Sequence, residues 1–221
     1  MLFAAHQPWV NWTWVRHHLG LIRHDLWEHL FLTVLAVVIG LLVTFALASI
    51  ARLWRPLEAP LVAACGALYA IPSLALFALL VPITGFTTLT AEIGLVGYTL
   101  LILLRNLLAG LKAVPEEVRD AARGLGFSRR HMLVRVEMPL ALPALFAGIR
   151  VATVTTIGLV TVTALIGQGG LGSLLYDGFQ RDFRTEEVIG AVGAIAMALT
   201  ADLVLVGAEK LLTPWTSRRS V

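Results

Sequence analysis

The sequence predicts an all-α integral membrane protein with five transmembrane helices. Of its 221 residues, 58% are hydrophobic and only 14% are charged, whereas a soluble domain carries about 25% charged residues. Several uncharged stretches reach the roughly 20 residues that a helix needs to cross a bilayer. The basic residues cluster beside these stretches, so the net charge of +3 does not indicate nucleic-acid binding.

The distribution of charges along the chain locates the spans. They are predicted at residues 30–50, 59–81, 89–108, 140–166 and 188–208. The second and third spans divide one long apolar region, in which Pro82 and Gly85 favour a turn. The single cysteine, Cys65, lies inside this region, so the chain has no disulfide framework.

The basic residues also predict the orientation, because Lys and Arg concentrate on the cytoplasmic flanks of membrane spans. Twelve of them fall on one side: Arg52, Arg55, Arg105, Lys112, Arg119, Arg123, Arg129, Arg130, Arg135, Lys210, Arg218 and Arg219. Four fall on the other side: Arg16, Arg23, Arg181 and Arg184. We therefore expect a multi-pass protein of the cell (plasma or inner) membrane, with its N-terminus outside and its C-terminus in the cytoplasm.

The segment before the first span is rich in tryptophan, which favours the interface between lipid headgroups and acyl chains. Its tryptophans are Trp9, Trp12, Trp14 and Trp27. A metal site formed by His17, His24 and Glu28 is an alternative, but no established ligand spacing is present. We expect no metal. The predicted organisation is an extracytoplasmic interfacial segment over 1–28, a membrane domain over 29–212 and a cytoplasmic tail over 213–221.

The charged insert after the third span, EEVRDAARGLGFSRRHMLVRVEMP (116–139), predicts a short amphipathic helix. Pro115 suits the first helical position, and Gly126 is suited to end the helix. Spacing of i, i+3, i+4 and i+7 places four residues on an apolar face: Val118, Ala121, Ala122 and Leu125. A helix this short is marginal in water, so we expect it to pack against something else.

The same insert resembles the "EAA" signature of ABC importer permeases. That signature reads Glu-Ala-Ala, three residues, Gly, nine residues, then Ile-x-Leu-Pro. Here Asp120-Ala121-Ala122, Gly126 and the segment 136–139 keep both spacings. Asp120, Val136 and Met138 depart from the signature conservatively. A pattern of fixed gaps over twenty residues is far more specific than a lone glycine motif.

Three further stretches resemble the permease subunits that import quaternary-amine osmoprotectants (glycine betaine, carnitine and choline). They are AIPSLALFALLVPITG (70–85), LLRNLLAGLKAVPEEV (103–118) and TALIGQGGLG (163–172). The last also resembles methionine-type permeases, so IPSLALFALL is the stretch that favours quaternary amines. The resemblance covers nearly everything from the first span to the fifth, and makes 29–212 a type I permease domain.

This resemblance implies that the insert is a coupling helix resting in a groove of a separate cytoplasmic ATPase dimer. The coupling residues it implies are Glu117, Asp120, Ala121, Ala122, Arg123, Gly126 and Pro139. The only lysines, Lys112 and Lys210, lie outside any G-x4-G-K-[ST] loop. ATP and Mg²⁺ are thus expected on the partner ATPase, with no cofactor on this chain, which is not expected to be an enzyme.

The implied assembly also contains a second permease subunit, identical or paralogous, and an extracytoplasmic substrate-binding protein. Aromatic cages bind quaternary ammonium groups by cation–π attraction, and the predicted spans contain no such cluster. High-affinity recognition is therefore expected to belong to the binding protein. This subunit would then provide a low-affinity passage through the lipid bilayer.

Polar residues within the spans are candidates for that passage, because they are costly in lipid. The path residues predicted are Tyr69, Ser73, Thr156 and Gln168. Arg150 and Asp202 fall at similar depth on antiparallel spans, which predicts an ion pair or a shared polar cavity; separate snorkelling is the alternative. Glycines of the segment 167–172 predict a flexible outer gate: Gly167, Gly169, Gly170 and Gly172.

Two other functions remain alternatives at this stage. One is a permease for methionine or another small amino acid within the same machinery. The other is a stand-alone secondary transporter, which would typically show paired repeats and coupling-ion carboxylates near the midplane. We find no repeat, and we expect Asp202 to be the one clear intramembrane acid.

Overall fold

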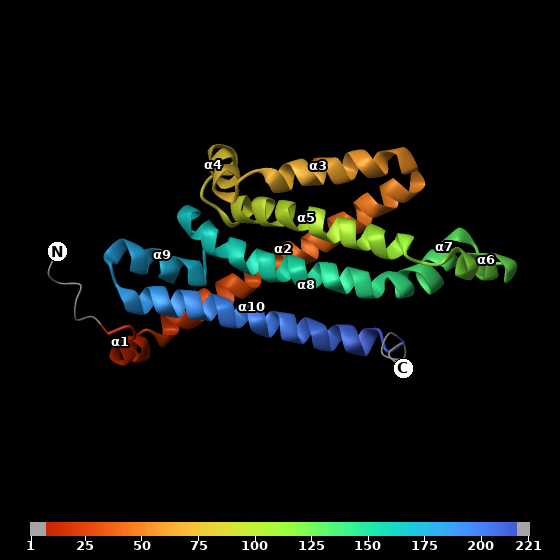
Figure 1. The fold of residues 1–221 in the computed structure, drawn as a ribbon. Helices are drawn as coiled ribbons and strands as arrows, with labels where there is room; N and C mark the ends of the chain where they lie inside the picture. The colour runs from red at the N-terminus through yellow and green to blue at the C-terminus, as the bar shows by residue number, and fades with distance from the viewer. Residues whose placement is uncertain (1–7, 216–221) are drawn as a thin grey trace.

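The computed structural model describes residues 8–215, and all regular structure in that range is helical. Figure 1 shows long helices lying side by side, with shorter ones gathered at both ends. The helices are α1 (Trp12–His17), α2 (Leu19–Leu53), α3 (Glu58–Ala70), α4 (Ser73–Thr84), α5 (Thr88–Lys112), α6 (Glu116–Gly124), α7 (Arg129–Met132), α8 (Met138–Thr163), α9 (Leu171–Arg181) and α10 (Arg184–Leu212). Short turns of other helical type occupy Arg55–Leu57, Leu133–Glu137 and Ala164–Ile166.

Helix α5 is the centre of the bundle, since it packs against α2, α3, α4 and α8. Small residues allow these helices to approach closely, as is common in membranes. A Cβ added at Gly110 of α5 would lie 2.9 Å from the carbonyl oxygen of Ala141 in α8. A Cβ added at Gly148 of α8 would lie 2.7 Å from the Cβ of Asn106 in α5. The contact between α5 and α8 therefore depends on glycine.

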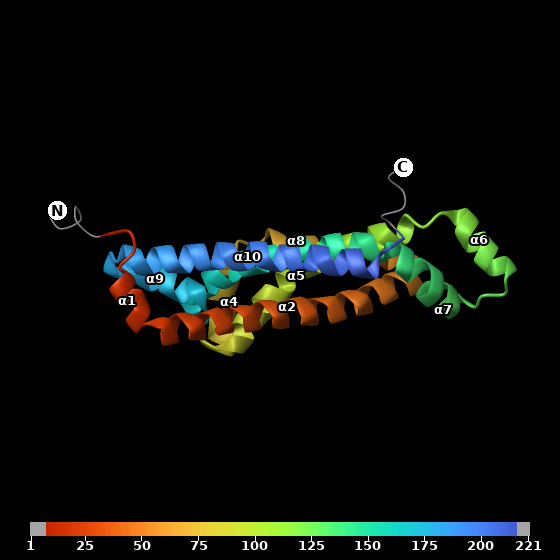
Figure 2. The same ribbon diagram turned by 90° about the horizontal axis from the view of Figure 1, so that it is seen from below.

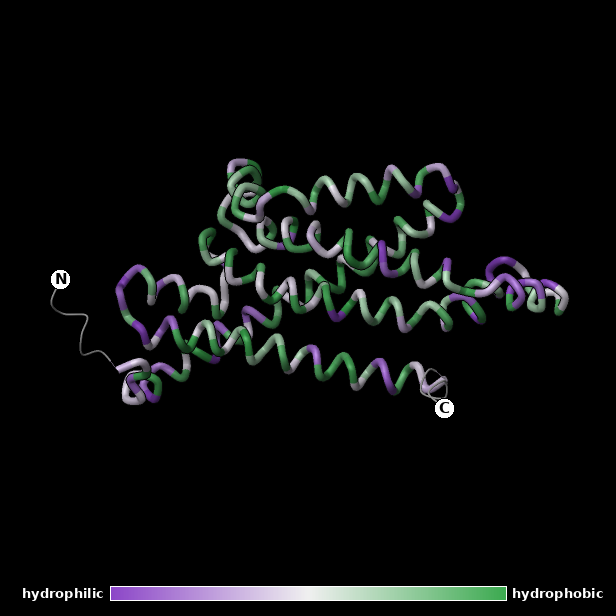
Figure 3. Tube along the Cα trace, in the orientation of Figure 1, coloured by the Kyte–Doolittle hydropathy of each residue, from purple (hydrophilic) through white to green (hydrophobic). Residues whose placement is uncertain are grey.

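The two ends of the bundle are polar and its middle is apolar (Figure 3). Helices α6 and α7 project from one end, while α1 and α9 lie at the other, as the second view also shows (Figure 2). Within residues 8–215, four helical segments are long and apolar enough to cross a membrane: Leu19–Leu53, Thr88–Lys112, Arg129–Ile166 and Arg184–Leu212. The chain is therefore an all-helical membrane protein of several spans.

The predicted second span over 59–81 falls on a helix pair that is sharply bent. The structure divides this region into Arg55–Ala70 and Ser73–Thr84, which meet at 94°. Pro72 has no amide hydrogen and disfavours helical geometry at the residue before it. Ile71 is accordingly extended, with φ −67° and ψ 128°. Pro72 is the signal for this break in the sequence, but it does not determine the size of the bend.

Other helix boundaries also differ from those predicted. Helix α2 begins at Leu19, so the end of the proposed interfacial segment is continuous with the first span. The fourth span begins at Arg129 instead of residue 140, because the π-helical turn Leu133–Glu137 links α7 to α8. Helix α9 was not predicted. Residues 1–7 and 216–221, including Arg218 and Arg219 of the predicted tail, lie outside the described range.

Candidate functional site

Helix α6 occupies the first part of the charged insert, between α5 and α7. It begins one residue later than predicted, since Pro115 is its N-cap with φ −60° and ψ 143°. Gly126 adopts φ +80°, a conformation that glycine enters without strain. The amide of Phe127 then donates to the carbonyl oxygen of Ala122 at 3.1 Å, which completes a Schellman cap. Gly126 therefore ends the helix as the sequence predicted.

The apolar face of α6 is mostly open to solvent. Leu125 is 77% exposed and Val118 is 37% exposed. Ala121 is also exposed, and Ala122 is the one buried residue of the helix. Exposed leucine and valine side chains on a short helix contribute to stability only when another surface packs against them. The helix therefore presents an apolar surface that this chain does not itself cover.

The opposite face of α6 is a network of charged side chains. The guanidinium of Arg119 donates to Glu116 at 3.0 Å, and that of Arg123 donates to Asp120 at 2.5 Å and also to Glu116. These hydrogen bonds, with that from Arg119 the strongest, hold the pKa of the exposed Glu116 carboxyl below its usual value. Glu116 and Glu117 also lie in the first turn, where negative charge is favourable.

Arg119 connects α6 to the membrane helices. Its Nη2 donates to the carbonyl oxygen of Leu111 in the last turn of α5 at 2.7 Å. Its Nε donates to Oε1 of Glu137 at 3.0 Å. Glu137 is buried and also forms an ion pair with Arg52 of α2. The sequence analysis missed Glu137 because it occupies the unspecified position of the signature, just before Met138 and Pro139.

The structure brings Arg150 and Asp202 together. The guanidinium of Arg150 donates twice, from Nε to Oδ1 at 2.8 Å and from Nη2 to Oδ2 at 3.0 Å. Glu209 lies 3.8 Å from the same guanidinium. Both paired side chains remain about one-third exposed, 34% and 33%. They line a cavity of about 500 Å³ between α8 and α10, together with Thr155.

The four predicted path residues are not gathered at one site. Tyr69 is exposed on α3, where its ring packs edge-on against that of Tyr98 at 5.8 Å. Ser73 is the first residue of α4. Thr156 is 1% exposed inside the bundle and so lines no open passage in this conformation. Gln168 accepts a hydrogen bond from Thr88 at 2.7 Å, near the start of α5.

The glycines of 167–172 are used for close packing within the chain, which differs from the expected flexibility. A Cβ at Gly170 would lie 2.6 Å from both the Asp25 carbonyl oxygen and the His29 amide nitrogen. Gly169 packs in the same way on Ala164, and Gly172 on Thr161. Only Gly167 of the four has open space around it.

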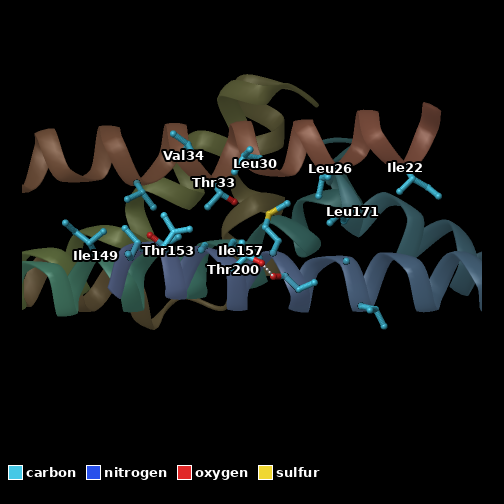
Figure 4. Close-up of a pocket in the computed structure, with 18 of the residues that line it drawn as sticks. Ile22, Leu26, Leu30, Thr33, Val34, Ile149, Thr153, Ile157, Leu171 and Thr200 are labelled. Atoms are coloured by element: carbon cyan, nitrogen blue, oxygen red, sulfur yellow. Dashed lines mark hydrogen bonds between the residues drawn. The ribbon is translucent and has the colours of Figure 1, made fainter. Parts of the chain in front are cut away.

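An apolar groove of about 840 Å³ runs along α2, α8 and α10 (Figure 4). Leu30 and Val34 face it from α2, and Thr153 and Ile157 face it from α8. Thr200 contributes a hydroxyl, which donates to the Ala196 carbonyl oxygen in its own helix. The walls of the groove are thus suited to contact with hydrocarbon.

Glu92 and His29 are two further buried polar residues that the sequence analysis did not single out. Glu92 is 6% exposed near the start of α5, and neither carboxylate oxygen has a hydrogen-bond partner among residues 8–215. The expectation that Asp202 is the one clear intramembrane acid does not allow for Glu92, which is buried within the predicted span 89–108. His29 is fully buried in α2, and its Nε2 lies 3.0 Å from the Ile157 carbonyl oxygen. Their positions within apolar runs were the available signals.

The three residues of the alternative metal site do not meet. His24 and Glu28 do lie near Asp25, with one ligand atom of each within 4.8 Å of the others. His17 instead contacts the Thr13 carbonyl oxygen in its own helix. Since His24 is well exposed and already contacts Asp25, this clustering does not require a metal.

An all-helical bundle of membrane-spanning length, with a charged helical insert at one end, defines a polytopic membrane transport component. Comparison with known proteins gives the family. Residues 36–218 match the family model described as "Binding-protein-dependent transport system inner membrane component", and the chain belongs to this family. It is therefore a permease component and not an enzyme.

Individual relatives agree with this assignment. The chain is 32% identical over 196 residues to the choline transport system permease protein OpuBB of Bacillus subtilis, covering 88% of this chain and 90% of that one. It is 35% identical over 200 residues to the osmoprotectant import permease protein OsmW of Salmonella typhimurium, covering 88% and 93%. The resemblance seen in the sequence is thus confirmed.

Solved structures share the fold. An inward-facing structure of the MetNI methionine ABC transporter superposes with a TM-score of 0.76 at 20% identity, covering 89% of this chain and 98% of that one. An amino acid ABC transporter solved with histidines superposes with a TM-score of 0.67 at 20% identity, covering 93% and 98%. At this level of identity the likeness concerns the fold alone.

Proposed function

We propose that the chain is the permease subunit of an ATP-driven importer of quaternary-amine osmoprotectants, with α6 as its coupling helix. The observation that carries the proposal is the uncovered apolar face of α6, at the end of a membrane bundle in this family. An apolar helix face beside acidic and basic side chains suits a groove on a partner protein. The partner is a cytoplasmic ATPase dimer.

We propose five crossings, and the directions of the helices support this number. Arg119 of α6 bonds to the Leu111 carbonyl oxygen at the end of α5 and to Glu137, which also pairs with Arg52 at the end of α2. Helices α2 and α5 therefore run in the same direction. The bent pair α3–α4 between them must then return across the bilayer, and it counts as one span. Together with α8 and α10 this makes five, with the permease domain at 29–212.

The positions of basic residues support an N-terminus outside and a C-terminus in the cytoplasm. In this orientation α6 faces the compartment that contains ATP. Two permease subunits, identical or paralogous, place two such helices on the ATPase dimer. Closure of the ATPases on ATP draws the helices together and turns the spans from inward to outward access, as a rigid-body switch.

The proposed contact with the ATPase uses the residues that the family signature implies. Those that α6 and its cap supply are Glu117, Asp120, Ala121, Ala122, Arg123 and Gly126. Of these, Ala121 lies between the exposed Val118 and Leu125 on the apolar face. Pro139 lies in the first turn of α8, where it starts the span beyond the insert.

The passage is proposed to run along the face of α8 and α10 that carries Arg150 and Asp202. Asp202 lies ten residues before the end of α10, which is about 15 Å from the cytoplasmic end. A partly exposed ion pair at this depth is unfavourable against lipid and favourable against water or a second subunit. Tyr69, Ser73, Thr156 and Gln168 remain candidates for other conformations, with the glycines of 167–172 as the outer gate.

The substrate class is proposed from the relatives, whose names specify choline and osmoprotectants. An extracytoplasmic binding protein would supply the high-affinity site, in keeping with the family description. The complex should be purified with its ATPase and binding protein and placed in proteoliposomes. Labelled choline or glycine betaine is expected to enter on addition of ATP, and uptake of methionine alone would assign a different solute.

Coupling through α6 is tested separately. Leu125→Asp should lose the ATPase on co-purification, because it places a charge on the apolar face of the proposed contact, while the subunit itself stays folded. Leu19→Asp is the matched control, since Leu19 is 59% exposed at the opposite end of the bundle. A Leu125→Asp subunit that retains the ATPase as well as the control would exclude α6 as the docking helix.

A further inference from the structure

Glu137 is a buried acid at the junction between the insert and the membrane. It is the last residue of the π-helical turn that leads into α8. Its side chain is only 3% exposed, although it lies within the polar end of the molecule. A buried carboxylate needs compensating charge or hydrogen bonds to remain favourable. Its partners therefore show what holds this junction together.

Two arginines from different helices supply that compensation. Arg119 of α6 donates from Nε to Oε1 at 3.0 Å. Arg52 of α2 forms an ion pair with Oε2, without the angle of a hydrogen bond. Arg119 reaches further, to the carbonyl oxygen of Leu111 at 2.7 Å. One carboxylate thus joins α6, α2 and the start of α8, with the end of α5 beside it.

Among residues 8–215, Arg119 is also the one side chain of α6 with a hydrogen bond to another part of the chain. The other charged pairs, from Arg123 to Asp120 and Glu116, stay within α6. The planar guanidinium of Arg119 fixes direction as well as distance, because its donors have a rigid geometry. Pulling Arg119 away would leave the Glu137 carboxylate buried with only Arg52, which is strongly unfavourable.

We propose that Glu137 is a positioning residue that holds the coupling helix α6 against the membrane spans. Through its carboxylate, a displacement of α6 is transmitted to α8 and α2. This inference rests on the proposed function of α6. A π turn within an α-helix is rare and is frequently found at functional sites. Glu137 lies at the end of such a turn, so a pull on its carboxylate acts at an irregular point of the helix, of the kind where helices kink.

The experiment uses the complete complex and a readout that does not depend on the solute. Thr155 lines the cavity between α8 and α10, so a Thr155→Cys reporter, in a Cys65→Ala background, is labelled with a soluble thiol reagent with and without ATP. The wild-type background should show an ATP-dependent change in labelling rate. Absence of that change would reject the proposed function itself, and the inference with it.

The variants are Arg119→Gln and Glu137→Gln, each with the reporter. Both should retain the ATPase on co-purification and continue to hydrolyse ATP. Their ATP-dependent change in labelling should be smaller by about fivefold or more, the usual lower range of a coupling between sites. Should Glu137→Gln fail to fold, Arg119→Gln decides alone, because it leaves the ion pair between Arg52 and Glu137 in place.

Glu58→Gln is the matched control. Glu58 forms an ion pair with Lys112, which joins α3 to α5 at the same end of the bundle but does not involve α6. The control should respond to ATP as the wild type does. Responses in Arg119→Gln equal to those of Glu58→Gln would overturn the inference, and so would loss of the ATPase from Arg119→Gln, since Arg119 would then act in docking.

Discussion

Gly170 is the position where a single added methyl group most directly tests the packing at the end of the bundle that carries α1 and α9. Its backbone has φ 49° and ψ −125°, a combination that residues with a side chain rarely adopt. An added Cβ would lie 2.6 Å from the backbone of both Asp25 and His29 in α2. Neither of those atoms belongs to a flexible side chain, so Gly170→Ala must displace the segment from α2.

The expected loss has two parts. The backbone conformation costs about 1–3 kcal/mol for a residue other than glycine, and overpacking against the backbone adds about 1–3 kcal/mol. Gly167 provides the matched control, because it also has a positive φ, +74°, but nothing lies within 4 Å of its Cβ position. Gly167→Ala should therefore lose only about 1–2 kcal/mol.

Thermal unfolding in detergent, followed by tryptophan fluorescence, measures the difference. For a chain of this length, about 2–4 °C of Tm corresponds to each kcal/mol. Gly170→Ala should thus unfold several degrees below Gly167→Ala, which itself unfolds slightly below the wild type. Equal Tm values for the two variants would refute the reasoning, because they would show that α2 does not lie against Gly170.

Two further outcomes are expected. Tyr98→Phe should lower the free energy of unfolding by about 1–2 kcal/mol, because the Tyr98 hydroxyl donates to the Ile71 carbonyl oxygen at the bend. The control is Tyr69→Phe, which removes a hydroxyl with no described hydrogen bond. Equal losses of stability for the two variants in thermal unfolding would exclude this role of Tyr98. Asp202→Asn should reduce ATP-dependent uptake into proteoliposomes. The double variant Arg150→Asp with Asp202→Arg exchanges the two charges and should restore part of this uptake. No recovery of uptake in the double variant would count against the ion pair.

The coarse architecture was predictable because it depends on local composition. Apolar runs of sufficient length predict membrane helices wherever they occur, and those of 30–50 and 89–108 lie within α2 and α5. Gly126 predicted the end of α6 because a positive φ is a local requirement. The family signature was equally accessible, since its gaps are counted along the chain.

The site depended more strongly on contacts between distant segments. Arg150 and Asp202 are 52 residues apart, and their similar depth indicated the pair without establishing its geometry. Pro72 marked a break in the second span, but the direction of the bend depends on how α4 packs against α5. Glu137 carried no local signal, because the arginines that compensate it come from α2 and α6.

By itself the sequence determined that this chain is helical, lies in a membrane, and carries a capped amphipathic insert with the spacing of importer permeases. These properties follow from hydropathy and backbone preference, which act over a few neighbouring residues. Only the tertiary structure decided that Arg52, Arg119 and Glu137 meet at one carboxylate, and that the glycines near the outer end serve close packing. Both features depend on which helices pack against one another. That packing is determined by the complementarity of entire helix surfaces.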